Sequence, residues 1–213
     1  MDETATVRTA MQPGGTGWDL RAEPGRTIGL LGTAGGGLTR LGLSLLVDLS
    51  RIAPVAVVDV RGWISPIAAF EVGIDPEHLV FVRSRERLQW PQVVAALLEG
   101  LQAVFAEVPV GIPDAHLRRL AALARSRGGA LLLRPLDGRL PSGVSHLSLQ
   151  SEEVKWNGAD AGHGCLRRRH LQMRAWGKGM GGIERLIEVE EDGENPLRVV
   201  AGMVAPAAGR ATG

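Results

Sequence analysis

The sequence predicts an α/β fold, in which a mostly parallel twisted sheet is flanked by helices and continues into antiparallel strands at the C-terminal end. Short apolar runs alternate with stretches of helical periodicity between residues 27 and 134. Residues 55–60 read VAVVDV, and such a valine-rich run is typical of a parallel strand that is buried on both faces. From residue 145 onwards strand-like segments follow one another without helices, which favours antiparallel pairing.

The alternating part of the chain has recognisable helix ends. Pro91 suits the first position of a helix, Asp114 suits an N-cap, and Gly128 with Gly129 provides a stop. This alternation of strands and helices predicts helices on both faces of the sheet. The expected strands are 27–31, 55–60, 79–82, 103–107 and 130–134, and the expected helices are 38–51, 66–72, 90–101 and 114–127.

The C-terminal part is expected to contain only strands and turns. Residues 167–174 alternate polar and apolar side chains and carry positive charge, whereas residues 183–191 are rich in glutamate. A basic strand beside an acidic strand gives favourable cross-strand pairs. The expected strands are 146–149, 154–156, 166–175 and 183–191, with a glycine-rich turn between the last two.

A single domain, residues 24–200, accounts for these elements. The 213 residues are enough for one α/β domain with a sizeable core. Residues 1–23 lack apolar periodicity and are interrupted by proline and glycine, so we expect a flexible lead-in. Residues 201–213 are small and weakly patterned, and we expect a disordered tail.

Composition excludes several classes of protein. The formal net charge of +1 excludes a broadly polybasic protein, so any nucleic-acid surface must be local. Cys165 is the only cysteine, which rules out an intramolecular disulfide and fits a reducing cytoplasm. No apolar run reaches the length of a transmembrane helix, and the N-terminus lacks the apolar core of a signal peptide. We therefore expect a cytoplasmic protein without membrane contact.

A glycine-rich segment after the first expected strand has the spacing of a phosphate-binding loop. A Walker A loop reads G-x-x-x-x-G-K-[ST], and Gly32, Gly37 and Thr39 occupy its glycine and hydroxyl positions. Leu38 occupies the lysine position, so the charge that neutralises the β- and γ-phosphates is absent. The segment is either a vestigial phosphate loop, formed with Gly36, or only a tight turn whose Leu38 extends the apolar stripe of the next helix. No cofactor is expected.

The order of these segments resembles that of the RecA recombinase ATPase core. Residues 25–32, GRTIGLLG, resemble the family's G-R-[IV]-x-E-[IL]-x-G strand. Asp59 followed by GIDPEHL at 73–79 resembles its second strand and L-G-[VI]-D-x-x-x-L segment. Residues 117–134 resemble its L-x-x-x-L-x-x-S-x-x-x-L-L-[FI]-x-N-Q stretch. The resemblance covers residues 24–192 and implies a RecA-like core.

The departures from that family fall on its chemistry. The resemblance places the Walker A lysine at Leu38, the catalytic glutamate at Arg61 and the Walker B aspartate at or near Glu107. It places the residue that senses the γ-phosphate at Arg134 or Pro135. Arginine cannot act as the general base that polarises water, and leucine cannot neutralise phosphate. The protein is therefore expected not to be an enzyme.

The assembly and DNA-binding segments of the recombinases also differ. Residues 108–113 lead almost directly into the next helix, so the first DNA-binding loop is missing, and the second is reduced to 135–144. The long N-terminal helix used for filament assembly has no counterpart in the lead-in. The resemblance therefore implies that no recombinase-type filament forms.

RecA-like proteins reduced in this way include the ImuA-type mutasome accessory proteins. That resemblance implies a role in the SOS response to DNA damage, in mutagenic translesion synthesis. The implied partners are an inactive Y-family polymerase relative (ImuB-like) and an error-prone C-family polymerase, with DNA as a further candidate. One alternative is a SulA-type inhibitor that binds the tubulin-like division protein. Another is a weak ATPase that binds nucleotide through the loop backbone and Thr39.

Two groups of residues are candidates for these contacts. A basic cluster on and after the strand 166–175 is the candidate DNA contact, although the same charges fit a solvated strand face paired to acidic residues. Exposed tryptophans are candidate partner contacts, because tryptophan is enriched at interface hot spots, although each could equally be a packing residue. His163 and Cys165 give too few ligands for zinc, so no metal is expected. The candidates are Arg167, Arg169, Arg174 and Lys178 for DNA, and Trp156 and Trp176 for a partner.

Overall fold

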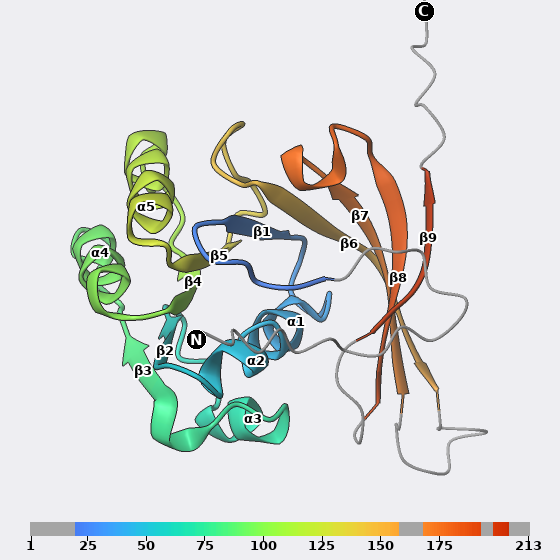
Figure 1. Cartoon of the computed structure of the whole chain (residues 1–213), viewed down its shortest axis with the longest axis horizontal. Helices are drawn as coiled ribbons and strands as arrows, with labels where there is room; N and C mark the ends of the chain where they lie inside the picture. Colours follow the sequence, from blue (N-terminus) through green and yellow to red (C-terminus); the bar gives the residue numbers. More distant parts are fainter. Residues whose placement is uncertain (1–19, 158–167, 193–197, 205–213) are drawn as a thin grey trace, which may run out of the picture.

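The computed structural model describes residues 20–157, 168–192 and 198–204 (Figure 1). Within these residues nine strands form one sheet in the order β3-β2-β4-β5-β1-β6-β7-β8-β9. The strands from β3 to β6 are parallel, and β6 to β9 pair antiparallel. The strands are β1 Thr27–Leu31, β2 Val55–Asp59, β3 Leu79–Arg83, β4 Ala103–Val108, β5 Ala130–Pro135, β6 Leu147–Asn157, β7 Arg168–Trp176, β8 Arg185–Asp192 and β9 Arg198–Val204. The expected fold class is confirmed.

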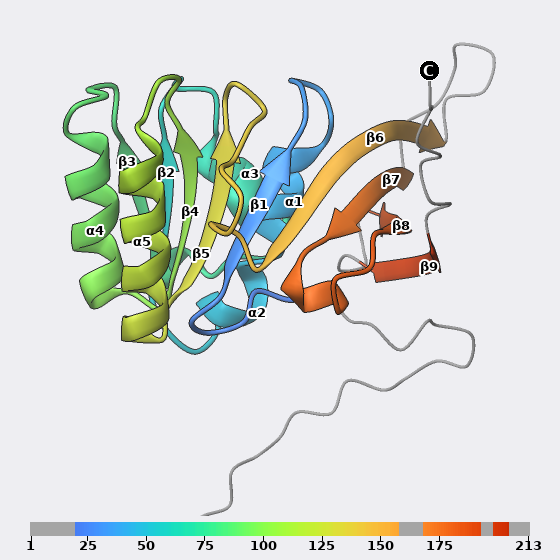
Figure 2. The same cartoon turned by 90° about the horizontal axis from the view of Figure 1, so that it is seen from above.

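Helices cover both faces of the parallel part, as Figures 1 and 2 show. One apolar core lies between the sheet and the three helices α1, α2 and α3, and it continues onto β6, β7 and β8. A second core lies between the opposite face and α4 with α5. The helices are α1 Leu38–Ser44, α2 Val47–Ser50, α3 Pro66–Glu71, α4 Trp90–Gly100 and α5 Asp114–Arg127, with single 3-10 turns at Pro76–His78 and Lys178–Met180.

The helix expected at 38–51 is two short helices, α1 and α2. The amide of Leu46 bonds to the carbonyl oxygen of Leu43 at 3.0 Å, which is the tighter pattern of a 3-10 turn. The turn buries both Leu45 and Leu46. The amphipathic pattern predicted the buried leucines correctly but could not show that one turn would tighten.

The strands expected at 146–149 and 154–156 are one strand, β6. The polar residues between them led to the wrong division, and they lie in the strand next to β7, with a register shift between Ser151 and Glu153. Polar side chains are tolerated there because they are exposed or half-buried.

The N-cap of α5 is Pro113 and not the expected Asp114. Asp114 is instead the first helical residue and pairs with Arg118 at 3.4 Å.

The domain also extends beyond the boundary expected at residue 200. β9 pairs with β8 from Arg198 to Val204, so the first four residues of the expected tail belong to the sheet. Residues 205–213 and nearly all of the lead-in 1–23 lie outside the described residues. Leu20, at the beginning of the described part, is buried in the core. None of the described helices has the length and apolarity needed to cross a bilayer.

Candidate functional site

The expected phosphate loop connects β1 to α1, as its sequence requires. Gly37 is the residue before α1 and has a φ of 73°, in the left-handed region where glycine is favoured. A Cβ atom at Gly37 would lie 2.7 Å from Cδ2 of Leu171 and 3.0 Å from Nη1 of Arg169. Side chains from β7 therefore pack directly against the loop, and only glycine fits there. Gly32, Gly36, Gly37 and Thr39 all lie in this segment or at the start of α1.

Leu38 at the lysine position is a core residue. Only 1% of its surface is exposed, and it packs in the same cluster as Leu41 and Leu46. The structure thus supports the interpretation that Leu38 extends the apolar stripe of the helix. A lysine ammonium in this place would lose its hydration without gaining a partner.

Glu107 at the end of β4 is the centre of a buried polar network. None of its side chain is exposed. Its Oε1 accepts hydrogen bonds from Nη2 and Nε of Arg61 at 2.5 and 3.1 Å, and from Nη1 of Arg134 at 3.4 Å. Its Oε2 accepts from the backbone amides of Val60 and Arg61 at 3.1 and 3.3 Å. Both carboxylate oxygens are therefore occupied by the protein itself.

The network reaches the loop through Arg134, the penultimate residue of β5, which lies opposite Glu107 in the sheet. Nη1 of Arg134 also donates to the hydroxyl oxygen of Thr39 at the start of α1. The four positions of the ATPase chemistry that the resemblance identifies, apart from the lysine, are thus bonded to one another. They are Thr39, Arg61, Glu107 and Arg134.

The electrostatics of the network favour the charged forms. Burial raises the pKa of Glu107, but the hydrogen bonds from Arg61 and from the amides of Val60 and Arg61 outweigh it, so the pKa lies below its ordinary value. Burial and the neighbouring Arg61 lower the pKa of Arg134, and Glu107 partly opposes them. An arginine keeps its proton at any physiological pH. Glu107 is therefore an anion between two guanidinium groups.

This arrangement leaves the groups poorly suited to bind magnesium and phosphate. Magnesium needs carboxylate, hydroxyl or water oxygens in an octahedral arrangement, and here the oxygens of Glu107 and Thr39 already accept from arginine. Arg61 stands where the resemblance places the general base, and it is held in its ion pair. Within the described residues there is no group of three or more His, Cys, Asp or Glu side chains that could hold a metal ion.

Of the described residues that were predicted to contact DNA, Arg169 and Arg174 lie on opposite faces of β7. Arg169 is only 5% exposed, because it faces the loop at Gly37, and its guanidinium lies 5.6 Å from the ring centre of Trp156. Arg174 points to the other face of β7 and pairs with Glu152 at 2.9 Å and with Glu184 at 3.1 Å. Lys178 is exposed in the following turn. Arg167 lies outside the described residues, as do His163 and Cys165.

Of the two tryptophans predicted to be exposed, the prediction is correct for Trp156 but not for Trp176. Trp156 is 50% exposed, Trp176 is partly buried and Trp90 is fully buried. Trp63 is 70% exposed, more than any other tryptophan in the described ranges. Its position directly after a buried strand and Gly62 is the signal that could have identified it, because turns after parallel strands lie at the edge where ligands bind.

The chain is similar to the crystal structure of the RadB recombinase, with a TM-score of 0.49 and 16% sequence identity, over 71% of this chain and 81% of that one. This similarity concerns the fold alone. A search of the curated proteins found no match. The model of the MT3502 N-terminal domain matches residues 23–140, which is more than half of the 213 residues. The chain belongs to the MT3502 N-terminal domain family.

Proposed function

We propose that this protein is a non-catalytic RecA-like adaptor in DNA-damage-induced mutagenic translesion synthesis. In this role it binds an inactive Y-family polymerase relative of the ImuB-like kind, which works with an error-prone C-family polymerase. The observation that carries the non-catalytic part is the network of Glu107 with Arg61 and Arg134, which occupies the groups an ATPase would use. The assignment to translesion synthesis rests on the ImuA-type resemblance of the motif order.

The energetics of the network support a role without hydrolysis. Phosphoryl transfer is catalysed by positioning and by charge stabilisation of the phosphates. To coordinate a metal, Glu107 would have to break its bonds to Arg61 and Arg134. This would leave the buried guanidinium of Arg134 and the partly exposed guanidinium of Arg61 without their anion. Breaking such a buried pair costs about 3–5 kcal/mol. Leu38 offers no compensating charge for the phosphates.

The adaptor role is tested by binding to the full-length polymerase relative from the same genome. Isothermal titration of the purified proteins should give a saturable complex of defined stoichiometry. An affinity pull-down from DNA-damaged cells should recover this protein together with the C-family polymerase. Recovery of the tubulin-like division protein without any polymerase would instead favour the SulA-type alternative and overturn the proposal.

The non-catalytic part has its own test. Purified protein should release no phosphate from ATP above a buffer blank, and a fluorescent ATP analogue should show no saturable binding up to millimolar concentration. Robust hydrolysis would contradict the proposal. Saturable binding without hydrolysis would show that the loop backbone and Thr39 still hold nucleotide.

A further inference from the structure

The loops that follow β2, β3 and β4 form one exposed surface at the carboxyl edge of the parallel strands. We call it the carboxyl-edge surface and define it by Trp63, Arg83, Arg85, Arg87, Leu88 and Val110, which are all exposed. β2 lies between β3 and β4 in the sheet, so these loops are neighbours. The carboxyl edge of a parallel sheet is where such folds bind their ligands.

Trp63 is presented on a loop that two buried carboxylates hold in place. Oδ1 of Asp59 accepts from the amides of Gly62 and Trp63 at 2.8 and 3.2 Å, and its Oδ2 accepts from Ile64 at 3.3 Å. Glu107 accepts the two preceding amides of the same loop. The guanidinium carbon of Arg61 lies 4.3 Å from the ring centre of Trp63 and covers one face of the indole.

This fixed indole is a suitable anchor for a partner. An exposed side chain normally loses conformational freedom on binding, and a side chain that is already held loses less. Asp59 and Glu107 thus shape a surface loop. Gly62 has a φ of 79°, so the turn that exposes Trp63 depends on a glycine.

The arginines tie the three loops together and give the surface its charge. Nη1 of Arg87 donates to the carbonyl oxygen of Gly111 at 2.9 Å, which links the loops after β3 and β4. A Cβ atom at Gly62 would lie 3.8 Å from Nη2 of Arg85, which places Arg85 beside the loop of Trp63. Nε of Arg83 lies 4.0 Å from Oδ2 of the buried Asp59. The segment 83–87 contains three arginines and one glutamate, so its net charge is positive.

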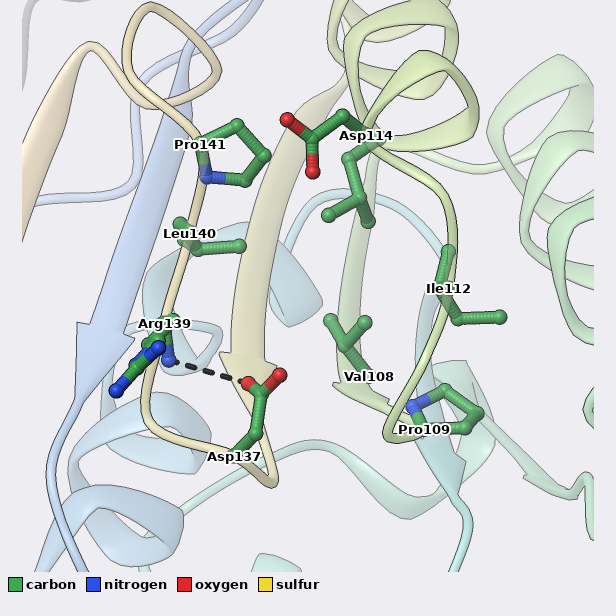
Figure 3. A pocket seen from close by; sticks show the side chains of 9 residues that line it. Val108, Pro109, Ile112, Asp114, Asp137, Arg139, Leu140 and Pro141 are labelled. Atoms are coloured by element: carbon green, nitrogen blue, oxygen red, sulfur yellow. Dashed lines mark hydrogen bonds between the residues drawn. The ribbon is translucent and has the colours of Figure 1, made fainter.

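A hollow lined by both polar and apolar side chains lies beside the surface, beyond β4 (Figure 3). It has a volume of about 280 Å³ and lies between the β4–α5 loop and the loop after β5. Val110 stands in the same short loop as its lining residues Pro109 and Ile112. Leu140 and Pro141 face them from the opposite loop in Figure 3. Asp114, Asp137 and Arg139 also line the hollow, so it is polar as well as apolar.

We propose that the carboxyl-edge surface docks the polymerase relative through an acidic segment that carries an apolar anchor residue. The inference rests on the proposed function for the identity of the partner, and on the surface itself for the chemistry of the segment. Carboxylates of the segment pair with Arg83, Arg85 and Arg87. Its apolar side chains contact Trp63 and Leu88, which are both exposed. Tryptophan and arginine are the residues most enriched at protein interface hot spots.

The aliphatic side chains of the carboxyl-edge surface favour a protein over a nucleic acid as its binding partner. Leu88 is 79% exposed, and Val110 is also exposed beside the arginines. Single-stranded nucleic acids bind by stacking bases on aromatic side chains, whereas leucine and valine offer no stacking face. An acidic peptide with apolar side chains satisfies both the charges and the aliphatic groups.

The test measures the affinity of the full-length polymerase relative for variants of this protein by isothermal titration. Trp63→Ala should raise the dissociation constant by about 30-fold or more, as expected for a hot-spot residue. The triple variant Arg83→Glu/Arg85→Glu/Arg87→Glu should abolish binding. The matched triple reversal Arg119→Glu/Arg125→Glu/Arg127→Glu on the exposed side of α5 should stay within about 3-fold of wild type, since surface charges away from an interface contribute little. Thermal melts verify that each variant is folded.

The outcomes separate the inference from the proposed function. If wild type binds the polymerase relative and the carboxyl-edge variants bind equally well, the proposed function holds and this inference is overturned. It is also overturned if Trp156→Ala weakens binding while Trp63→Ala does not. If wild type does not bind the polymerase relative, both proposals fail. Fluorescence anisotropy with a labelled oligothymidylate adds one more outcome: loss of oligothymidylate binding in the Arg83 triple variant, with unchanged protein binding, would assign the surface to nucleic acid.

Discussion

Replacement of Glu107 by alanine is the perturbation that tests the buried network most directly. The substitution removes the acceptor of hydrogen bonds from Arg61, Arg134 and the amides of Val60 and Arg61. Arg134 remains in place with only 7% of its side chain exposed, so its charge cannot regain its hydration. The variant therefore keeps the cost of burying cations and loses the anion that compensates for it.

The expected loss follows from that geometry. Removing one partner of a buried ion pair costs about 3–5 kcal/mol of unfolding free energy. For a chain of this size each kcal/mol lowers the melting temperature by about 2–4 °C. We therefore expect the melting temperature of Glu107→Ala to fall by about 6–20 °C. Glu107→Gln keeps the shape and one acceptor oxygen, so it should lie between wild type and the alanine variant.

Urea and thermal unfolding, followed by far-UV circular dichroism, measure these changes. Glu99→Ala is the matched control, because Glu99 is exposed on α4 and surface substitutions usually change stability by less than about 0.5 kcal/mol. A loss below about 1 kcal/mol for Glu107→Ala would refute the reasoning. Such a result would mean that the network contributes no more than a surface pair does.

The other predictions concern the same site. The pKa of Glu107 is lower in the folded protein than its ordinary value. The ionised carboxylate therefore stabilises the fold above the ordinary pKa, and this stabilisation is lost as the pH falls through the folded pKa. Urea titrations should show the stability advantage of wild type over Glu107→Gln shrinking below about pH 4. Leu38→Lys buries an ammonium group in an apolar cluster, so it should cost at least about 2 kcal/mol in urea unfolding and should not restore ATP hydrolysis in a phosphate-release assay. Gly37→Ala introduces a Cβ at a φ of 73° and 2.7 Å from Leu171. The melting temperature should therefore fall, with a loss of about 1–3 kcal/mol in the free energy of unfolding. Gly35→Ala is the control for the left-handed backbone alone, because a Cβ there meets nothing within 4 Å.

Local patterns were sufficient for most elements. The helix expected at 114–127 has those bounds in the structure, and Gly128 ends it in the left-handed conformation. Asp114 was predicted to be the N-cap but is the first helical residue. An N-cap side chain and an acidic side chain in the first turn give the same local signal. The separation of β6 into two strands failed for a different reason. Polar residues interrupt an apolar run in the same way whether the chain turns or continues beside another strand, and only the pairing with β7 distinguishes the two.

In the candidate site, too, local patterns predicted some residues and failed for others. The lysine position of the loop is filled by Leu38, and the helical period of α1 indicates that this residue faces the core. The place of Arg169 could not be predicted in this way. Its strand was expected to present a basic face, but β7 packs beside β6 above the loop, so Arg169 faces inwards.

The sequence by itself determined the alternation of strands and helices, the loop between β1 and α1, and the replacement of its lysine by Leu38, because these depend on neighbours within a few residues along the chain. Only the tertiary structure decided that Arg61 and Arg134 neutralise Glu107 and that Trp63 stands on the loop this network holds. The bonded side chains of Arg61 and Glu107 are 46 residues apart, and those of Thr39 and Arg134 are 95 apart. They meet because long-range packing sets the order β2-β4-β5-β1, and no local pattern encodes that order.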